Sequence, residues 1–251
     1  MTERLLVVVA HPDDETFGTG SLIAAAAKAG VEVTVCCATR GEAGEAHGVS
    51  PGADLAAVRE GELRAAGAEL GVHRIVLLDY RDSDMAGVPA EGTLCAADPS
   101  ELVEAVRAVV AEVRPSVVVT LDPDHGDGHR DHATIGRATI DACPEDMRVY
   151  VFAVTRSLLA RWFALMQEVR PDTAHLELDR QGLGRPDADI TTVVDVRSVR
   201  GVRERAIALH RSQVPPSEGM PEDLLTDFLE TDRLVRISPP WPGGPVETGL
   251  F

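Results

Sequence analysis

The chain has 251 residues, 44% of them hydrophobic, and a formal net charge of −17. This length suffices for a buried core, and we expect one domain over residues 1–251, irregular after about residue 215. The acidic balance argues against nucleic acid or a membrane surface as partner, because both attract basic patches. No apolar stretch approaches the roughly 18 residues of a membrane span. Four cysteines without a CxxC pair favour reduced thiols in the cytoplasm.

Strand-like and helix-like segments alternate along the chain. Apolar runs typical of buried strands cover 5–10, 31–38, 74–78, 116–121 and 148–154. Helical patterns, several of them bounded by Gly or Asp capping residues, cover 16–29, 54–70, 99–113 and 131–142. Further helices are predicted at 158–169 and 199–211, a strand at 190–196, and loops at 171–186 and 239–251. The alternation predicts a Rossmann-like α/β fold, with a mostly parallel sheet flanked by helices on both faces and a less regular C-terminal part.

The most informative stretch is His11-Pro12-Asp13-Asp14-Glu15, directly after the first apolar run. Open α/β sheets bind ligands at the carboxyl ends of their strands, so these side chains stand where a site is expected. A catalytic zinc usually takes three protein ligands, histidine and aspartate among them, and keeps one position for water. We expect His11 and one aspartate to bind the metal and the other aspartate to act as base. The residues alone do not choose between Asp13 and Asp14.

A second cluster follows the apolar run at 116–121 and contains His125, His129 and His132. His129 and His132 are three residues apart at the start of a predicted helix, so they would point roughly the same way. One of them could complete the metal shell, and the other could donate to an oxyanion or a leaving amine. Asp131 could orient a histidine through its second ring nitrogen. Two ligand-rich loops, each following a strand, predict one metal site assembled from both.

With these motifs the chain resembles the LmbE/PIG-L-like zinc-dependent de-N-acetylases, which remove the acetyl group from N-acetylglucosaminyl conjugates. The resemblance rests on residues 10–15 and 129–132, and on shorter matches in the family's order at 39–44, 59–63, 80–83 and 210–213. It implies a set of three zinc ligands: His11, Asp14 and His132. It further implies that Asp13 is the general base and that His129 stabilises the oxyanion or assists the leaving amine.

The resemblance also assigns supporting and substrate-binding positions. Asp131 would support a histidine, and Arg59 and Asp82 match positions near the sugar hydroxyls. The mycothiol-pathway branch has a tyrosine where this chain has Asp127, so an acid replaces a phenol that could hydrogen-bond an oxyanion. His125 stands where relatives often have glycine. Because Asp127 and His125 line the expected entrance and differ from that branch, we do not carry its mycothiol-precursor specificity over to this chain.

We therefore expect a cytoplasmic zinc-dependent N-deacetylase that acts on a small-molecule amino-sugar conjugate, such as an antibiotic, secondary-metabolite or thiol-precursor intermediate. Fe²⁺ could occupy the same ligands as Zn²⁺, since imidazole and carboxylate suit both ions. No nucleotide cofactor is expected, because the first strand lacks the glycine fingerprint of dinucleotide-binding folds. Two alternatives are an amidase that cleaves a larger acyl group from a glucosamine conjugate and a non-catalytic sugar-binding protein. A homo-oligomer is compatible with the sequence.

Overall fold

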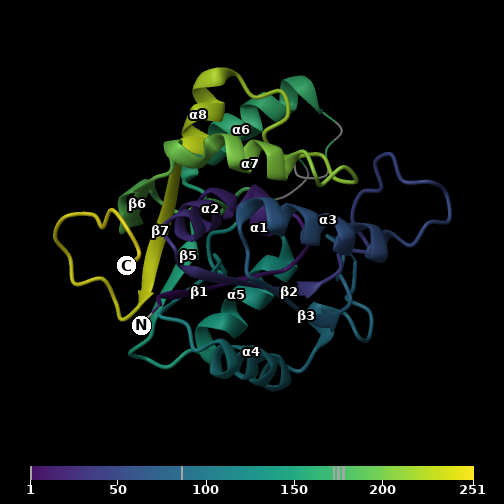
Figure 1. Cartoon of the computed structure of the whole chain (residues 1–251). Helices are drawn as coiled ribbons and strands as arrows, with labels where there is room; N and C mark the ends of the chain where they lie inside the picture. Colours follow the sequence, from purple (N-terminus) through teal and green to yellow (C-terminus); the bar gives the residue numbers. More distant parts are fainter. Residues whose placement is uncertain (1, 86, 172, 174–175, 177–178) are drawn as a thin grey trace.

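The computed structural model describes residues 2–85, 87–171, 173, 176 and 179–251. These residues contain a seven-stranded sheet in the order β3-β2-β1-β4-β5-β7-β6 (Figure 1). The strands are β1 (Arg4–Val9), β2 (Glu32–Thr39), β3 (Arg74–Tyr80), β4 (Val117–Leu121), β5 (Arg148–Phe152), β6 (Thr192–Asp195) and β7 (Thr231–Ser238). Strands β1 to β5 run parallel, whereas β7 is antiparallel to both β5 and β6. The mostly parallel Rossmann-like sheet predicted from the sequence is confirmed.

Helices cover both faces of the sheet, as predicted (Figure 1). One face carries α1 (Asp14–Phe17), α2 (Gly20–Lys28), α3 (Leu55–Leu70) and α7 (Arg200–Ile207), with α6 (Arg156–Val169) and α8 (Glu222–Glu230) beyond them. The opposite face carries α4 (Pro99–Val113) and α5 (Arg130–Ala142). Short 3₁₀ turns occur at Leu94–Ala96, Asp187–Asp189 and Arg197–Val199. Among the described residues, no helix has the length and apolarity needed to cross a membrane.

The local signals in the sequence explain the core elements. The side chains of β1 from Leu5 onward are completely buried because helices cover both faces of the strand. Helix α3 begins at the N-cap Asp54, whose side chain accepts the N–H of Ala57. It ends at Gly71, which adopts a left-handed φ of 83°. Strand burial and helix caps are encoded within a few residues of each element, so these elements were predictable.

The prediction of a single helix over 16–29 is wrong, because this stretch forms two helices, α1 and α2. The break lies at Gly18 and Thr19, where an added Cβ on Gly18 would stand 2.9 Å from the Asp14 carbonyl oxygen. Arg203 of α7 donates to carbonyl oxygens that the break leaves free, those of Thr16 at 3.1 Å and Gly18 at 3.3 Å. The arginine that stabilises the break comes from a distant segment, so the local pattern did not indicate it.

The segment after about residue 215 is not irregular, because it contains α8 and β7. Strand β7 lies between β5 and β6 and therefore belongs to the sheet itself. It begins Thr231-Asp232-Arg233, and these polar residues, two of them charged, interrupt the apolar run by which strands were recognised. The strand predicted at 190–196 is present as the shorter β6. Of the loop predicted at 171–186, residues 172, 174–175 and 177–178 lie outside the described residues.

The strand order brings the two predicted ligand loops together. Strands β1 and β4 are neighbours in the middle of the sheet, with Leu5 opposite Val117. From these two strands the chain continues outward in opposite directions, to β2 and β3 on one side and to β5 on the other. In doubly wound sheets such a reversal leaves a crevice at the carboxyl ends of the strands. His11 follows β1 and Asp122 follows β4, so both motifs open at this crevice.

Candidate metal centre

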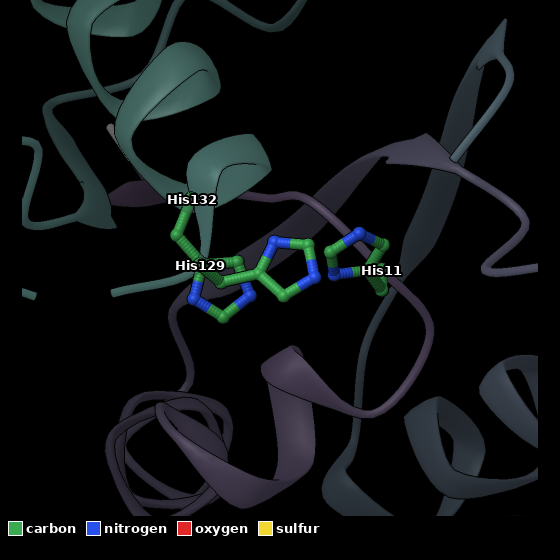
Figure 2. Close-up of side chains that lie close together, drawn as sticks. All are labelled: His11, His129 and His132. Atoms are coloured by element: carbon green, nitrogen blue, oxygen red, sulfur yellow. The ribbon is translucent and has the colours of Figure 1, made fainter. Parts of the chain in front are cut away.

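Three histidines from the two loops converge at the carboxyl ends of β1 and β4 (Figure 2). His11 follows β1, His129 is the N-cap of α5, and His132 lies in the first turn of that helix. Each offers a ring nitrogen within 4.8 Å of the others. The ring centroids of His11 and His129 are 4.6 Å apart, and those of His129 and His132 are 4.8 Å apart. Both motifs therefore contribute to one site.

A carboxylate, that of Asp14, lies between two of these imidazoles. Its Oδ1 is 3.2 Å from His132 Nε2, and its Oδ2 is 3.4 Å from His11 Nδ1. Asp14 Oδ2 also accepts the backbone N–H of His11 at 2.8 Å, which fixes the carboxylate in the loop. Imidazole nitrogens with a carboxylate in contact with two of them are the kinds of donor that catalytic zinc uses. The site thus offers four candidate ligands, of which a catalytic zinc would use three.

The ring nitrogens that face away from Asp14 have carboxylate partners of their own. His11 Nε2 lies 3.1 Å from Asp131 Oδ2, and His132 Nδ1 lies 3.0 Å from Asp127 Oδ2. A carboxylate that accepts the second N–H of a histidine fixes the tautomer and orientation of the ring. The predicted support of a histidine by Asp131 stays a prediction, and the contact with His11 is consistent with it.

A second group of potential ligands consists of His11, Asp82 and Asp131. Asp131 Oδ2 already accepts the N–H of Ser83 at 2.9 Å, and its Oδ1 contacts the Cys95 thiol at 2.9 Å. Asp82 Oδ1 accepts the backbone N–H of the residue two positions further along the chain and lies 3.7 Å from His11 Nε2. Since these oxygens are engaged with protein donors, we regard the group as support for His11 and not as a separate metal site.

The acidic groups give the site a strong preference for positive charge. Burial alone would lower the pKa of His11, but Asp131 and Asp14 raise it to about 9. Burial opposes protonation of His132 in the same way, and Asp127 and Asp14 raise its pKa well above the usual value. Two imidazoles that hold protons this firmly occupy an environment that would equally stabilise a divalent cation. The electrostatics therefore fit a metal ion.

His129 differs from its two neighbours in charge. Burial, together with the adjacent His11 and His132, lowers the pKa of His129 to about 3, so the ring is neutral. Its Nδ1 accepts the N–H of Asp131 at 3.2 Å, as the cap of α5. A neutral ring that accepts at Nδ1 carries its proton on Nε2. His129 therefore presents a hydrogen-bond donor inside the cluster.

Asp13 stands beside Asp14 in an unusual backbone conformation, with a φ of 115°. Its Oδ2 accepts a hydrogen bond from Arg59 Nη2 at 3.0 Å. Burial and the neighbouring Asp14 raise the pKa of Asp13 to about 6, although the Arg59 guanidinium opposes this shift. A carboxylate with a pKa near neutrality is suited to accept a proton under working conditions.

The residues expected to contact substrate occupy different environments. Arg59 is only 3% exposed and donates to the Gly41 carbonyl at 2.7 Å as well as to Asp13. Asp82 is also buried, beside His11. His125 is turned to the Gly182 carbonyl, 3.1 Å from its Nδ1. Asp127 contacts His132, as described above. The structure therefore brings Asp82 and Asp127 to the histidine cluster and Arg59 to Asp13, whereas His125 contacts the segment that follows α6.

Arg185 is a supporting residue that was absent from the sequence predictions. Arg185 forms two hydrogen bonds with the buried carboxylate of Asp122, at 2.8 Å and 2.7 Å. Asp122 Oδ1 also accepts the N–H of His125 at 3.1 Å, so this carboxylate shapes the loop that leads to His129. Arg185 lies in a segment that was predicted only as a loop, and nothing in its local sequence indicated a buried partner.

Comparison with known proteins agrees with the fold and the motifs. The model of the family described as GlcNAc-PI de-N-acetylase (PIG-L) matches residues 6–143. A 1D-myo-inositol 2-acetamido-2-deoxy-alpha-D-glucopyranoside deacetylase of Rhodococcus opacus (strain B4) is 37% identical, covering 92% of this chain and 89% of the relative.

Solved structures share the fold at lower identity. An N,N'-diacetylchitobiose deacetylase from Pyrococcus horikoshii aligns with a TM-score of 0.63 and 23% identity, covering 94% of this chain and 84% of that one. GalB, a 4-carboxy-2-hydroxymuconate hydratase from Pseudomonas putida KT2440, aligns with the same TM-score of 0.63 at 20% identity, covering 97% and 100%. The fold alone therefore does not determine the reaction, whereas the family match and the relative at 37% identity do identify the lineage. The chain belongs to the PIG-L (LmbE-like) family of de-N-acetylases, as its two motifs predicted.

Proposed function

We propose that this protein hydrolyses the N-acetyl group of a GlcNAc-type amino-sugar conjugate in a metal-dependent reaction. The observation that carries the proposal is the contact between Asp14 Oδ1 and His132 Nε2 at 3.2 Å. It joins the two motifs in one donor set, directly beside Asp13. A sugar-binding module would need neither a cation site nor a buried carboxylate with a pKa near neutrality.

We propose Zn²⁺ as the metal, with His11, Asp14 and His132 as its ligands. The donor set and the preference of the site for positive charge support this choice, and Fe²⁺ fits the same donors. When bound, the metal would lower the pKa of a water molecule and polarise the acetamide carbonyl.

The residues of the chain supply the proton transfers and hold the reacting groups. Asp13 accepts the proton of the attacking water, with its carboxylate held by Arg59. His129 presents its Nε2–H to the negative charge that develops on the carbonyl oxygen, a role suited to a neutral imidazole. The proton taken by Asp13 then leaves on the departing amine. The products are acetate and a free amino sugar.

The substrate class is inferred from the relative at 37% identity, whose name specifies an acetamido-glucopyranoside of inositol. We propose a small conjugate of N-acetylglucosamine and leave open what is attached to the sugar. We do not specify the attached group because Asp127 replaces the tyrosine of the mycothiol branch and lies 3.0 Å from His132. An ionised acid cannot donate to an oxyanion, so the entrance of this site differs chemically from one with a phenol.

The proposal can be tested by acetate release from a panel of conjugates by the zinc-loaded protein. The panel contains free N-acetylglucosamine, its inositol and thiol-type conjugates, aminoglycoside-like pseudodisaccharides and glycopeptides, each also as a longer N-acyl analogue. We expect acetate from at least one class. Asp13→Ala should bind zinc normally and lose turnover by roughly 10²–10⁴-fold, the contribution of a general base. Asp124→Ala, an exposed acid in the second loop, is the matched control.

Each alternative predicts a different pattern in this panel. Release of only the longer acyl groups would favour an amidase over a deacetylase. No release from any member, with zinc bound, would overturn the proposed activity in favour of a binding role. Full turnover by zinc-loaded Asp13→Ala would refute the general-base assignment while leaving the deacetylase in place.

A further inference from the structure

A buried histidine of the C-terminal part, His210, contacts the loop that carries the proposed base. It opens the stretch His210-Arg211-Ser212-Gln213, to which the proposed reaction gives no role. Its side chain is completely buried, and its Nε2 lies 2.8 Å from Glu15 Oε1. The ring of Phe17 packs against it at 5.5 Å between centroids. His210 Nδ1 has no hydrogen-bond partner among the described residues, so Nε2 makes the polar contact that defines the ring position.

Glu15 transmits this contact to Asp13. Its side chain is also completely buried, and its second oxygen, Oε2, accepts the backbone N–H of Asp13 at 2.9 Å. A buried carboxylate is stable only when donors surround it, and His210 supplies one of them. Another is the Thr16 hydroxyl, which donates to Oε1. His210, Glu15 and the Asp13 backbone thus form a series of two hydrogen bonds.

The backbone of Asp13 needs such support. Its φ of 115° and ψ of −34° are rarely adopted by residues other than glycine, so the backbone of Asp13 is strained. Its carbonyl oxygen is held by the first turn of α1, through the N–H of Thr16 at 2.9 Å and of Phe17 at 2.6 Å. Its N–H is held by Glu15. The strained conformation therefore depends on both ends of the residue being bound.

We propose that His210 is a positioning residue, which fixes Glu15 and through it the backbone conformation that aims the Asp13 carboxylate at the reacting centre. The inference rests on the proposed role of Asp13 as base. Among the described residues, the side chain of His210 contacts Glu15, Thr16 and Phe17, none of which is a candidate metal ligand. Removal of the His210 N–H leaves the buried Glu15 carboxylate with one hydrogen-bond donor fewer. The hydrogen bond between Glu15 and the Asp13 N–H is then weaker.

Two variants test this relation. His210→Leu fills the space of the imidazole with a side chain that has no hydrogen-bond donor. His210→Gln places an amide N–H near the position of Nε2. We expect His210→Leu to lower kcat for acetate release by roughly 10²-fold, the effect of misplacing a catalytic group by about 1 Å. Its KM and zinc affinity should be unchanged, and His210→Gln should recover most of the lost kcat. His73→Leu, a histidine with a 66% exposed side chain, is the matched control and should behave as wild type.

A second readout needs no substrate. In ¹⁵N-labelled protein, the amide of Asp13 should be protected from hydrogen exchange and shifted downfield, as expected for an N–H bound to a carboxylate. We expect both signatures in wild type and in His210→Gln, and their loss in His210→Leu. Unchanged exchange and shift in His210→Leu would overturn the proposal. So would equal losses of kcat in the two variants, or a loss that appears only in zinc affinity. If wild type releases no acetate, the proposed function fails, and the amide measurement still decides whether His210 holds Asp13.

Discussion

The first five strands and the remainder of the chain contribute to the site in different ways. Residues 4–152, from β1 to the end of β5, contain the candidate metal ligands, Asp13, and the two loops that meet at the sheet edge. Residues 153–251 contain none of the proposed ligands. The polar side chains that they supply to the first part include Arg185 to Asp122, Arg203 to carbonyls at the end of α1, and His210 to Glu15.

The difference between the two parts teaches how the site is built. In the first part, the polar groups of the site gather at the carboxyl ends of β1 and β4. In the second part, Arg203 and His210 are buried, Arg185 is nearly so, and all three contact backbone or side chains next to the site. Binding chemistry and structural support thus come from different stretches of sequence. Changes in the two parts should therefore have different consequences, for reaction and metal in one and for stability and placement in the other.

The largest effect is expected from Arg203, whose replacement tests the structural role of the C-terminal part. Its side chain is completely buried, it donates to the carbonyl oxygens of Thr16 and Phe17, and it lies 3.7 Å from the buried Asp232. Arg203→Met removes the positive charge near Asp232 and the hydrogen-bond donors to these carbonyl oxygens. We expect the free energy of unfolding to fall by roughly 3–5 kcal/mol in chemical denaturation, as for other broken buried pairs.

The control for this prediction lies on the same helix. Arg205 is 62% exposed and pairs with Glu69 at 2.8 Å. Arg205→Met should change the free energy of unfolding by no more than about 1 kcal/mol, because exposed ion pairs contribute little. Equal destabilisation by the two variants would show that the buried contacts of Arg203 have no special importance.

The second prediction separates the two histidines of α5. His132→Ala should lower zinc affinity by more than the roughly 10–100-fold that an outer partner contributes. His129→Ala should keep zinc and lower kcat by roughly 10²–10³-fold, the contribution of one oxyanion donor. Chelator competition measures the affinity, and acetate release measures the rate. The reverse pattern would make His129 the third ligand, which the distances among the three rings also allow.

A third prediction concerns Asp127, the residue that replaces the family tyrosine. Its carboxylate lies 3.0 Å from His132 Nδ1, so we expect Asp127→Ala to weaken zinc binding by roughly 10–100-fold. Asp127→Asn retains an oxygen acceptor and should lose less. Asp124→Ala, in the same loop but 52% exposed, should bind zinc as wild type does. If Asp127→Ala matches this control, Asp127 faces the substrate and does not orient the ligand.

The smallest effect is a pH dependence that originates in the C-terminal part. Burial raises the pKa of Asp232 to about 6, although Arg203 opposes the shift, whereas an unfolded aspartate titrates near 3.9. Between about pH 4 and pH 6 the folded state therefore binds more protons, so stability falls as the pH rises through this window. Asp232→Asn should remove this slope, which is on the order of 1 kcal/mol per pH unit, in denaturation measured at several pH values. Identical slopes would mean that Asp232 is ionised throughout.

Much of the fold and of the candidate site could be predicted because the signals are local. The apolar run before His11 predicted β1, and the cap residue Gly71 predicted the end of α3. The parallel sheet then places the ends of β1 and β4 at one edge, which explains why two separate motifs indicated one site. The residues alone could not distinguish the roles of Asp13 and Asp14, because adjacent carboxylates offer the same chemistry. That distinction came from the family resemblance.

The features that were missed depend on contacts between distant segments. Strand β7 was overlooked because Asp232 and Arg233 interrupt its apolar pattern, yet pairing with β5 and β6 places it within the sheet. The break between α1 and α2 and the burial of Glu15 depend on Arg203 and His210 in the same way. Hydrophobic periodicity and helix caps are written within a few neighbouring residues, so the sequence by itself determined the layers and the ligand loops. The partner of a buried charge is selected by packing between segments far apart in the chain, and only the tertiary structure decided it.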